Sequence, residues 1–195
     1  MRSVALAVGL LLLAATPAGA VTLWVNGDTP AVRWQRIADS FAVPTPDVVV
    51  TVRFDGALAA KRCTEGSDGC YDGELIVGGT GPYAISIFRH EAGHLYRDLT
   101  MTDRDLAALL RTARLAYVDE PEEVVADLYM TCSVSTDPER ASAYAARWAS
   151  GVNSWYFPRV LRRACGWFRR RGAPLLPRPP PPQGLLPEQT LGPAV

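Results

Sequence analysis

The spacing of hydrophobic positions predicts short strands near the N-terminus, with one helix between the first and second. Thr29 and Pro30 supply a cap and a first-turn proline for that helix, which we expect over 31–42. The predicted strands are rich in β-branched and other apolar residues and are bounded by turn-forming residues. They cover residues 22–25, 47–54 and 74–78.

A longer helix is predicted to begin near Thr80 to Pro82. Its apolar side chains recur at spacings of three and four residues, which places them on one face toward the core. These residues are Ile85, Phe88, Ala92, Leu95 and Leu99. His90, His94 and Asp98 fall on a different face, at spacings of four. That face can line a cleft while the apolar face anchors the helix.

Helix start signals predict four further helices toward the C-terminus. The first covers 103–116 after the cap residue Thr102, and the second runs from Pro121 to about Cys132. The last two begin near Pro138 and Pro158. We therefore expect an α+β domain, in which a short mixed or antiparallel sheet packs on one side of the long helix and further helices follow.

The N-terminus has the features of an export signal. Arg2 precedes an unbroken apolar run over 4–15, which is too short to cross a bilayer as a helix. Ala18-Gly19-Ala20 then provides the small residues that signal peptidase requires. We expect residues 1–20 to be a signal peptide and the protein to be secreted, without a transmembrane segment.

The C-terminus differs in another way, since residues 173–195 are rich in proline, with five prolines in 177–182. Such a segment is expected to be an extended or disordered tail. Residues 21–172 remain, a length that suits one domain with its own core. The chain contains 20 basic and 20 acidic side chains. This balance predicts no general attraction to nucleic acids or anionic lipids.

Four cysteines in an exported chain are expected to form disulfide bonds. Three pairings are possible. The favoured one joins Cys63 to Cys70, which closes a short loop of turn-forming residues, and Cys132 to Cys165, which links two C-terminal helices. A zinc site made of thiolates is the alternative use, but the chain has no Cys-x-x-Cys spacing to favour it.

The strongest chemical signal is the pair of histidines, the only two in the sequence, in His90-Glu91-Ala92-Gly93-His94. On a helix this spacing directs both imidazoles to one face, where they can share a metal ion. Glu91 then lies within reach of a metal-bound water and is expected to act as general base. The alternative is a helix that carries two solvated histidines.

The helix that begins at Pro121 offers carboxylates for a third ligand. Glu123 and Asp127 are four residues apart and share one face, while Val124 and Leu128 point toward the core. Acidic residues in a first helical turn are also favoured by the helix dipole alone. Glu123 is the preferred ligand, with Glu122, Glu120 and Asp98 as alternatives.

His90-Glu91-x-x-His94, followed by Glu123-x-x-Ala126-Asp127, resembles the gluzincins, which are zinc metallopeptidases with a downstream glutamate ligand. Both thermolysin-like members and the minimal ImmA/IrrE type share this arrangement. The resemblance implies a small zincin-like fold and a Zn²⁺ ion held by His90, His94 and Glu123. The metzincins fit less well because they need a third histidine where this chain has Thr100.

The resemblance also implies roles for neighbouring residues. Asp127 matches an aspartate that orients the first zinc histidine. Asp98 matches another aspartate, which thermolysin-like members carry four residues after the second zinc histidine. By the same resemblance, the strand at 74–79 is expected at the sheet edge, where it pairs with an extended peptide or protein substrate. No later histidine is present to stabilise an oxyanion. Tyr71, Tyr129, Tyr156 or an arginine are the remaining candidates.

The last predicted helix is basic and amphipathic. Its arginines lie beside apolar residues such as Leu161 and Phe168, so it can either bind an acidic surface or pack on the domain. We favour packing, with the arginines in solvent. The main hypothesis for the whole chain is a secreted zinc metallopeptidase. The alternatives are an exported zincin-fold binding or regulatory module with little activity, and a structural protein without zinc.

Overall fold

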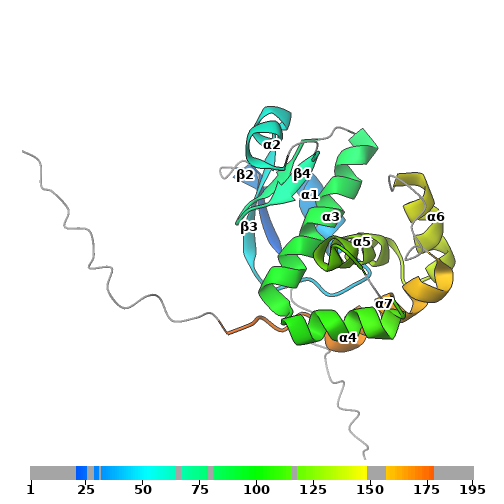
Figure 1. The fold of residues 1–195 in the computed structure, drawn as a ribbon. Helices are drawn as coiled ribbons and strands as arrows, with labels where there is room; N and C mark the ends of the chain where they lie inside the picture. Colours follow the sequence, from blue (N-terminus) through cyan, green and yellow to red (C-terminus); the bar gives the residue numbers. More distant parts are fainter. Residues whose placement is uncertain are drawn as a thin grey trace, which may run out of the picture.

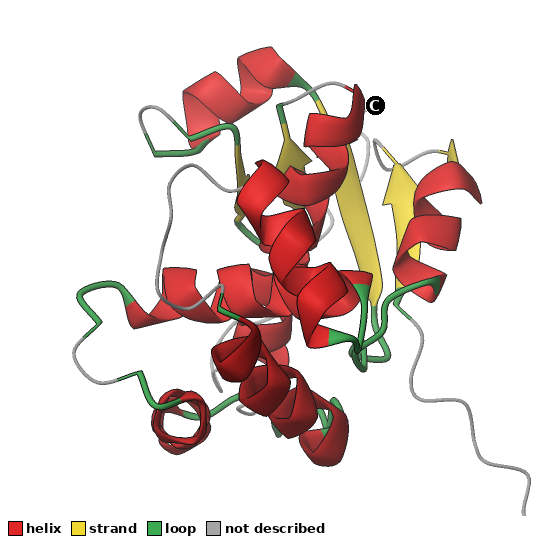
Figure 2. Ribbon diagram, turned by 90° about the vertical axis from the view of Figure 1, so that its right-hand side faces the viewer, coloured by secondary structure: helices red, strands yellow, loops and turns green. Residues whose placement is uncertain are grey.

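The computed structural model describes residues 21–25, 29–30, 32–64, 67–78, 81–115, 118–148 and 157–177. The expected signal peptide, residues 1–20, lies outside the described residues. Of the expected tail, 173–195, residues 173–177 are described and residues 178–195 are not. Within the described part of the chain, one half of the molecule contains the strands and the other gathers most of the helices (Figure 1, Figure 2).

Five strands form one mixed sheet in the order β2-β1-β3-β5-β4. They are β1 (Thr22–Val25), β2 (Thr29–Pro30), β3 (Val49–Phe54), β4 (Gly69–Tyr71) and β5 (Leu75–Val77). The three inner strands run parallel to one another, and each outer strand is antiparallel to its neighbour. The α+β class expected from the sequence is therefore confirmed.

The edge of the sheet differs from the expectation for residues 74–79. β5 lies inside the sheet, between β3 and β4, so β4 forms the edge. The chain reverses at Gly73, whose φ of 68° is a conformation that glycine adopts without strain, and β4 pairs back onto β5. The expected edge position of 74–79 is therefore wrong. The turn-forming residues before Cys70 give β4 no strand signal in the sequence, because β4 is stabilised by its pairing with β5.

Two further differences concern short elements. Thr29 and Pro30 do not start a helix, because they pair with the end of β1 as strand β2, and α1 covers only Val32–Asp39. The helix α2 (Gly56–Arg62) has no counterpart among the predicted elements. Its start is fixed by Asp55, whose carboxylate accepts hydrogen bonds from the backbone N–H groups of Ala57 and Leu58.

The five later helices begin at or near the residues expected for them. They are α3 (Gly81–Thr100), α4 (Asp103–Ala113), α5 (Pro121–Val134), α6 (Pro138–Trp148) and α7 (Pro158–Arg171). Thr102 and Asp105 form a capping box at the start of α4. Proline occupies the first turn of both α5 and α7.

The long helix α3 belongs to both halves of the domain. Phe88 and Leu95 pack in a hydrophobic cluster with the sheet, whereas Ala92 and Tyr96 pack in a second cluster with α4, α5 and α7. All four side chains are buried. The polar face of α3 is thereby held between the sheet edge and the start of α5.

Two disulfide bonds join the pairs favoured from the sequence. Cys63–Cys70 connects the end of α2 to the edge strand β4, and both cysteines are partly exposed. Cys132–Cys165 connects α5 to α7 in the core, where both are buried. One bond therefore fastens the sheet edge, and the other fastens the helical half.

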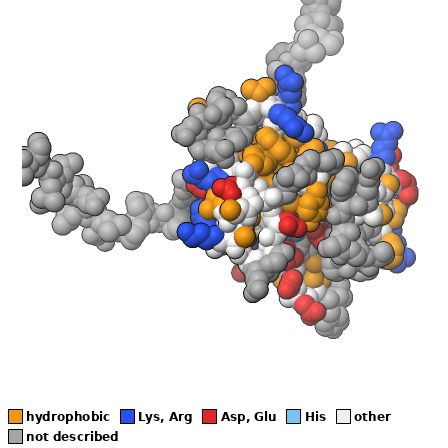
Figure 3. All heavy atoms as spheres, turned by 90° about the horizontal axis from the view of Figure 1, so that it is seen from above, with side chains coloured by type: hydrophobic (Ala, Val, Ile, Leu, Met, Phe, Trp, Pro, Cys, Tyr) orange, Lys and Arg blue, Asp and Glu red, His pale blue; other side chains and the backbone are white. Residues whose placement is uncertain are grey.

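The basic helix α7 packs on the domain through its apolar face. Leu161, Cys165 and Phe168 are buried, while Arg169 and Arg170 are exposed. On the face shown in Figure 3, the Lys and Arg side chains lie in separate groups. Within the described residues, no helix combines the length and the apolar character needed to cross a bilayer.

The helices α3 and α5 approach each other closely at Gly93. A Cβ atom at this position would lie 2.6 Å from the Cα of Ala126 and 2.8 Å from its carbonyl oxygen. Both are backbone atoms, so a side chain at position 93 could fit only if α5 moved away. Gly93 therefore sets the distance between the two helices.

We expect Gly93→Ala to destabilise the metal-free protein by about 2 kcal/mol, because the added methyl group overpacks the helix contact. Gly166→Ala in α7 is the matched control, since a Cβ there would meet only the end of the flexible Arg170 side chain, at 3.2 Å. This control should be neutral or stabilising by up to about 1 kcal/mol. Urea unfolding followed by circular dichroism measures both, and equal midpoints would contradict the proposed role of Gly93.

Candidate metal centre

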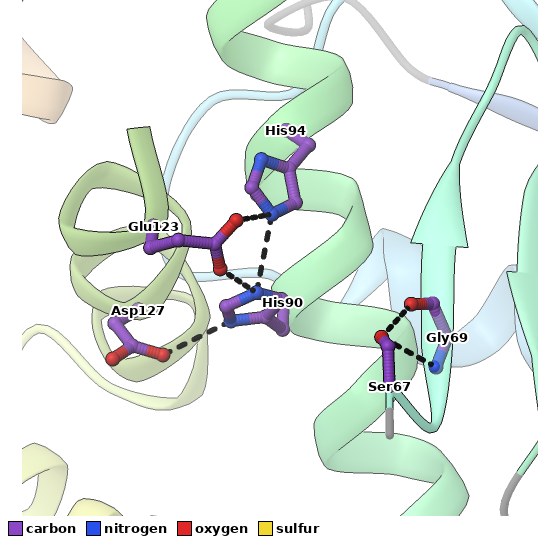
Figure 4. A network of polar contacts seen from close by, with 6 residues as sticks. All are labelled: Ser67, Gly69, His90, His94, Glu123 and Asp127. Carbon is purple, nitrogen blue, oxygen red and sulfur yellow. Dashed lines mark hydrogen bonds and ion pairs between the residues drawn. The ribbon is translucent and has the colours of Figure 1, made fainter. Parts of the chain in front are cut away.

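Four of the residues singled out from the sequence face one another across α3 and α5 (Figure 4). His90 and His94 lie one turn apart on α3, and Glu123 and Asp127 lie one turn apart on α5. The i, i+4 spacing puts each pair on one face of its helix. The contact at Gly93 brings the two faces together.

Three ligand atoms converge at this point. The Nε2 atoms of His90 and His94 are 3.2 Å apart. The two carboxylate oxygens of Glu123 lie 3.1 Å from Nε2 of His90 and 3.4 Å from Nε2 of His94. Among the described residues, these three form the group of side chains that can hold a metal ion.

The spacing of these atoms fits a zinc ion. Zn²⁺ binds imidazole nitrogen and carboxylate oxygen at about 2.1 Å, so the ligand atoms of a tetrahedral site lie about 3.4 Å apart. The observed separations are 3.1, 3.2 and 3.4 Å. Two neutral nitrogens and one carboxylate are also ligands that zinc accepts.

Asp127 contacts the other nitrogen of the first histidine. Its Oδ1 lies 2.9 Å from Nδ1 of His90. When Nδ1 donates a hydrogen to this carboxylate, Nε2 of the neutral ring keeps its lone pair for the centre. The contact expected from the resemblance is therefore present.

The other candidate ligands lie elsewhere. Glu122 forms an ion pair with Arg97 at 2.7 Å, and Glu120 precedes α5 as its N-cap residue. Asp98 lies one turn beyond His94 and lines the cleft, but the described residues show no hydrogen bond from it to either histidine. Glu123 is the carboxylate that the structure places against both rings.

Glu91 lies beside the histidines in a different environment. Its side chain is 4 % exposed, and its Oε2 atom has no hydrogen-bond partner among the described residues. Burial raises the pKa of Glu91 to about 7, although the positive charges of His90 and His94 act in the opposite direction. The cleft thus contains a buried carboxyl group that titrates near neutral pH.

In the metal-free protein, hydrogen bonds within the ligand cluster shift the pKa values of His90 and Glu123. Burial disfavours a charge on His90, but the hydrogen bonds to Asp127 and Glu123 outweigh it and raise the pKa of His90 to about 10. The hydrogen bonds from His90 and His94 lower the pKa of Glu123 well below its usual range. His90 is therefore protonated at neutral pH in the metal-free protein.

A cleft of about 500 Å³ opens over these residues. The edge strand β4 lines one side, α3 forms the floor, and the start of α5 lines the other side. β4 approaches the floor closely at Gly69, where a Cβ atom would lie 2.5 Å from a methyl group of Ile87 and 3.1 Å from Oε1 of Glu91. Glycine at position 69 therefore allows the strand to lie directly beside Glu91.

Only some of the candidates for oxyanion stabilisation lie in the cleft among the described residues. Tyr71 and Arg97 line the cleft. Tyr129 is fully buried, and its hydroxyl group donates a hydrogen bond to the carbonyl oxygen of Pro44, so it is not available in the cleft. Tyr156 lies outside the described residues.

Sequence reasoning missed the wall of the cleft formed by β4. The only signal was the close spacing of Cys63 and Cys70, which indicated a fastened loop but not a strand beside the histidines. Arg97 also had no sequence signal, because its partner Glu122 lies on another helix.

Comparison of the chain with protein-family models, with curated proteins and with solved structures found no match.

We expect zinc binding to release about one proton per ion near pH 8, because Zn²⁺ requires a neutral His90 ring and the pKa of His90 is about 10 in the metal-free protein. Zinc affinity should therefore rise about tenfold per pH unit from pH 7 to 9 and level off above pH 10. Calorimetry in two buffers of different ionisation enthalpy measures the released proton. A zinc affinity that does not change with pH would contradict the protonated cluster.

Proposed function

We propose that the protein is a secreted zinc metallopeptidase of the gluzincin type. In this proposal His90, His94 and Glu123 hold Zn²⁺, and Glu91 acts as the general base. The observation that carries the proposal is the buried, unpaired carboxyl oxygen of Glu91 in the same cleft as the three converging ligand atoms. A purely structural zinc site is closed by four protein ligands and has no use for a free base beside them.

The chemistry divides between the ion and the protein. Zinc with an open coordination position lowers the pKa of water toward 7 and polarises a carbonyl oxygen. Glu91 accepts the proton of the attacking water and passes it to the leaving amine. Burial raises the pKa of Glu91 in the metal-free protein, and the charge of a bound Zn²⁺ would act in the opposite direction and favour the ionised base. Asp127 fixes the orientation and tautomer of His90 through the 2.9 Å contact.

The edge strand β4 is the element that would hold a peptide substrate. β4 pairs with β5 on one side only. The hydroxyl group of Ser67 contacts both the backbone N–H and the carbonyl oxygen of Gly69 (Figure 4), so an extended peptide that pairs along β4 would replace this hydroxyl group. Gly69 keeps this strand close to Glu91. A peptide bound along β4 would therefore pass over the general base.

We expect Glu91→Gln to keep zinc but to lose about 10²- to 10⁴-fold in peptide cleavage, because the amide has nearly the same shape and accepts no proton. Metal analysis of the purified protein and cleavage of casein or a peptide library provide the two measurements. Glu139→Gln on α6 removes the same charge from an exposed site and should leave both unchanged. Zinc binding without cleavage by the unmodified protein would favour a binding or regulatory module instead.

Export is the second part of the proposal. The two disulfide bonds suit an oxidising compartment, which agrees with the export signal proposed for residues 1–20. Expression of the full chain should yield a processed protein that begins near Val21 and lies outside the cytoplasm. N-terminal sequencing and cell fractionation test this. A protein that retains residues 1–20 would show that the segment is not a cleaved signal.

A further inference from the structure

A second groove meets the metal cleft at the C-terminal end of α3. It has a volume of about 720 Å³ and is lined by the start of β3, the end of α3 and residues 175–177. Asp98 lines both this groove and the metal cleft. A ligand that extends from the metal centre toward the C-terminal end of α3 would therefore meet the groove at Asp98.

The walls of the groove combine apolar surface with negative charge. Val49 and Leu175 are large hydrophobic side chains that are 70 % and 48 % exposed, and Leu99 adds to the same surface. Asp47 and Asp98 are exposed carboxylates, and neither has an ion-pair or hydrogen-bond partner for its side chain among the described residues. The lining includes no lysine, arginine or histidine.

The segment after α7 makes the groove a fixed feature of the domain. The backbone N–H of Leu176 donates a hydrogen bond of 2.8 Å to the carbonyl oxygen of Leu99. Residues 175–177 are thereby attached along the end of α3 and form one wall. The carboxylates stand on elements distant in sequence, since Asp47 precedes β3 and Asp98 lies on α3.

A lysine or arginine side chain matches this combination. Its aliphatic stem can cover the exposed leucine and valine surface, and its charged end can reach a carboxylate. An acidic side chain would meet two like charges, and a purely apolar side chain would leave both carboxylates without a partner. We infer that the groove is a subsite for a basic side chain of a peptide substrate, with Asp98 and Asp47 as the specificity residues. This inference rests on the proposed peptidase function.

The position of Asp98 limits where the basic residue lies in the peptide. Asp98 is one helical turn from His94, which corresponds to about 6 Å along α3. An extended peptide advances about 3.3 Å per residue. The basic residue therefore lies within about two residues of the bond that is cleaved.

The test uses pairs of quenched fluorescent peptides that differ only by lysine or the uncharged norleucine at each position near the cleaved bond. The unmodified protein should prefer lysine at one position, by up to about fivefold in kcat/KM for each carboxylate. Asp47→Asn should reduce the preference while norleucine peptides are cleaved as before. Asp98→Asn, which also changes the lining of the metal cleft, should lower kcat/KM more for lysine peptides than for norleucine peptides. Glu139→Gln should retain the full preference. Equal cleavage of every lysine and norleucine pair would overturn the inference.

A charge reversal and a binding measurement separate this inference from the proposed function. Asp98→Lys should shift the preference from lysine to glutamate, a change that general loss of folding cannot produce. Zinc-loaded Glu91→Gln should bind lysine peptides more tightly than norleucine peptides in fluorescence anisotropy, although it does not cleave them. If no peptide is cleaved but this preference is found and Asp98→Asn removes it, the peptidase proposal fails and the subsite stands. If peptides are cleaved without any charge preference, the subsite fails and the peptidase stands.

Discussion

The contact between the backbones of α3 and α5 at Gly93 and Ala126 is the constraint on which the site depends. No side chain fits between the helices at this point, so their separation is set by backbone atoms rather than by adaptable packing. Glu123 lies one turn before Ala126 and Asp127 directly follows it. At this separation the two carboxylates reach opposite nitrogens of the same ring, His90. A wider crossing would leave the histidines without their acidic partners.

The same arrangement explains why the acidic residues around the histidines behave differently. Glu123 is held by two imidazoles and Glu122 by Arg97, so each has a partner of opposite charge. Glu91 lines the cleft with only 4 % of its surface exposed, and burial is the main influence on its protonation in the metal-free protein. Asp98 is the carboxylate of α3 that remains exposed. The different environments of these carboxylates follow from where each lies relative to the helix crossing, and they separate the proposed metal ligand Glu123 from the proposed base Glu91 and the proposed specificity residue Asp98.

Sequence reasoning worked where the signal is local. The capping pattern at Thr102, the first-turn proline at Pro121 and the i, i+4 spacings identified helices and the faces that meet in the cleft, because these features depend on residues within one or two turns. It failed where pairing between distant segments decides the outcome. Thr29 and Pro30 carry a helix start signal, yet pairing with β1 makes them a strand. Likewise β4 has little strand character of its own and depends on β5 and on the bond between Cys63 and Cys70.

The sharing of α3 between two hydrophobic clusters has a consequence for how the domain responds to ligands. Loss of either cluster would expose one buried side of α3 to water and weaken the helix that the other cluster packs against, so we expect the two halves to unfold together. A ligand held at the middle of α3, by side chains from α3 and α5, binds only when both halves are assembled. Its binding free energy is therefore added to the cooperative stability of the entire domain, by mass action, rather than to that of one loop. The fraction of folded protein would then increase with the fraction of protein that has bound the ligand.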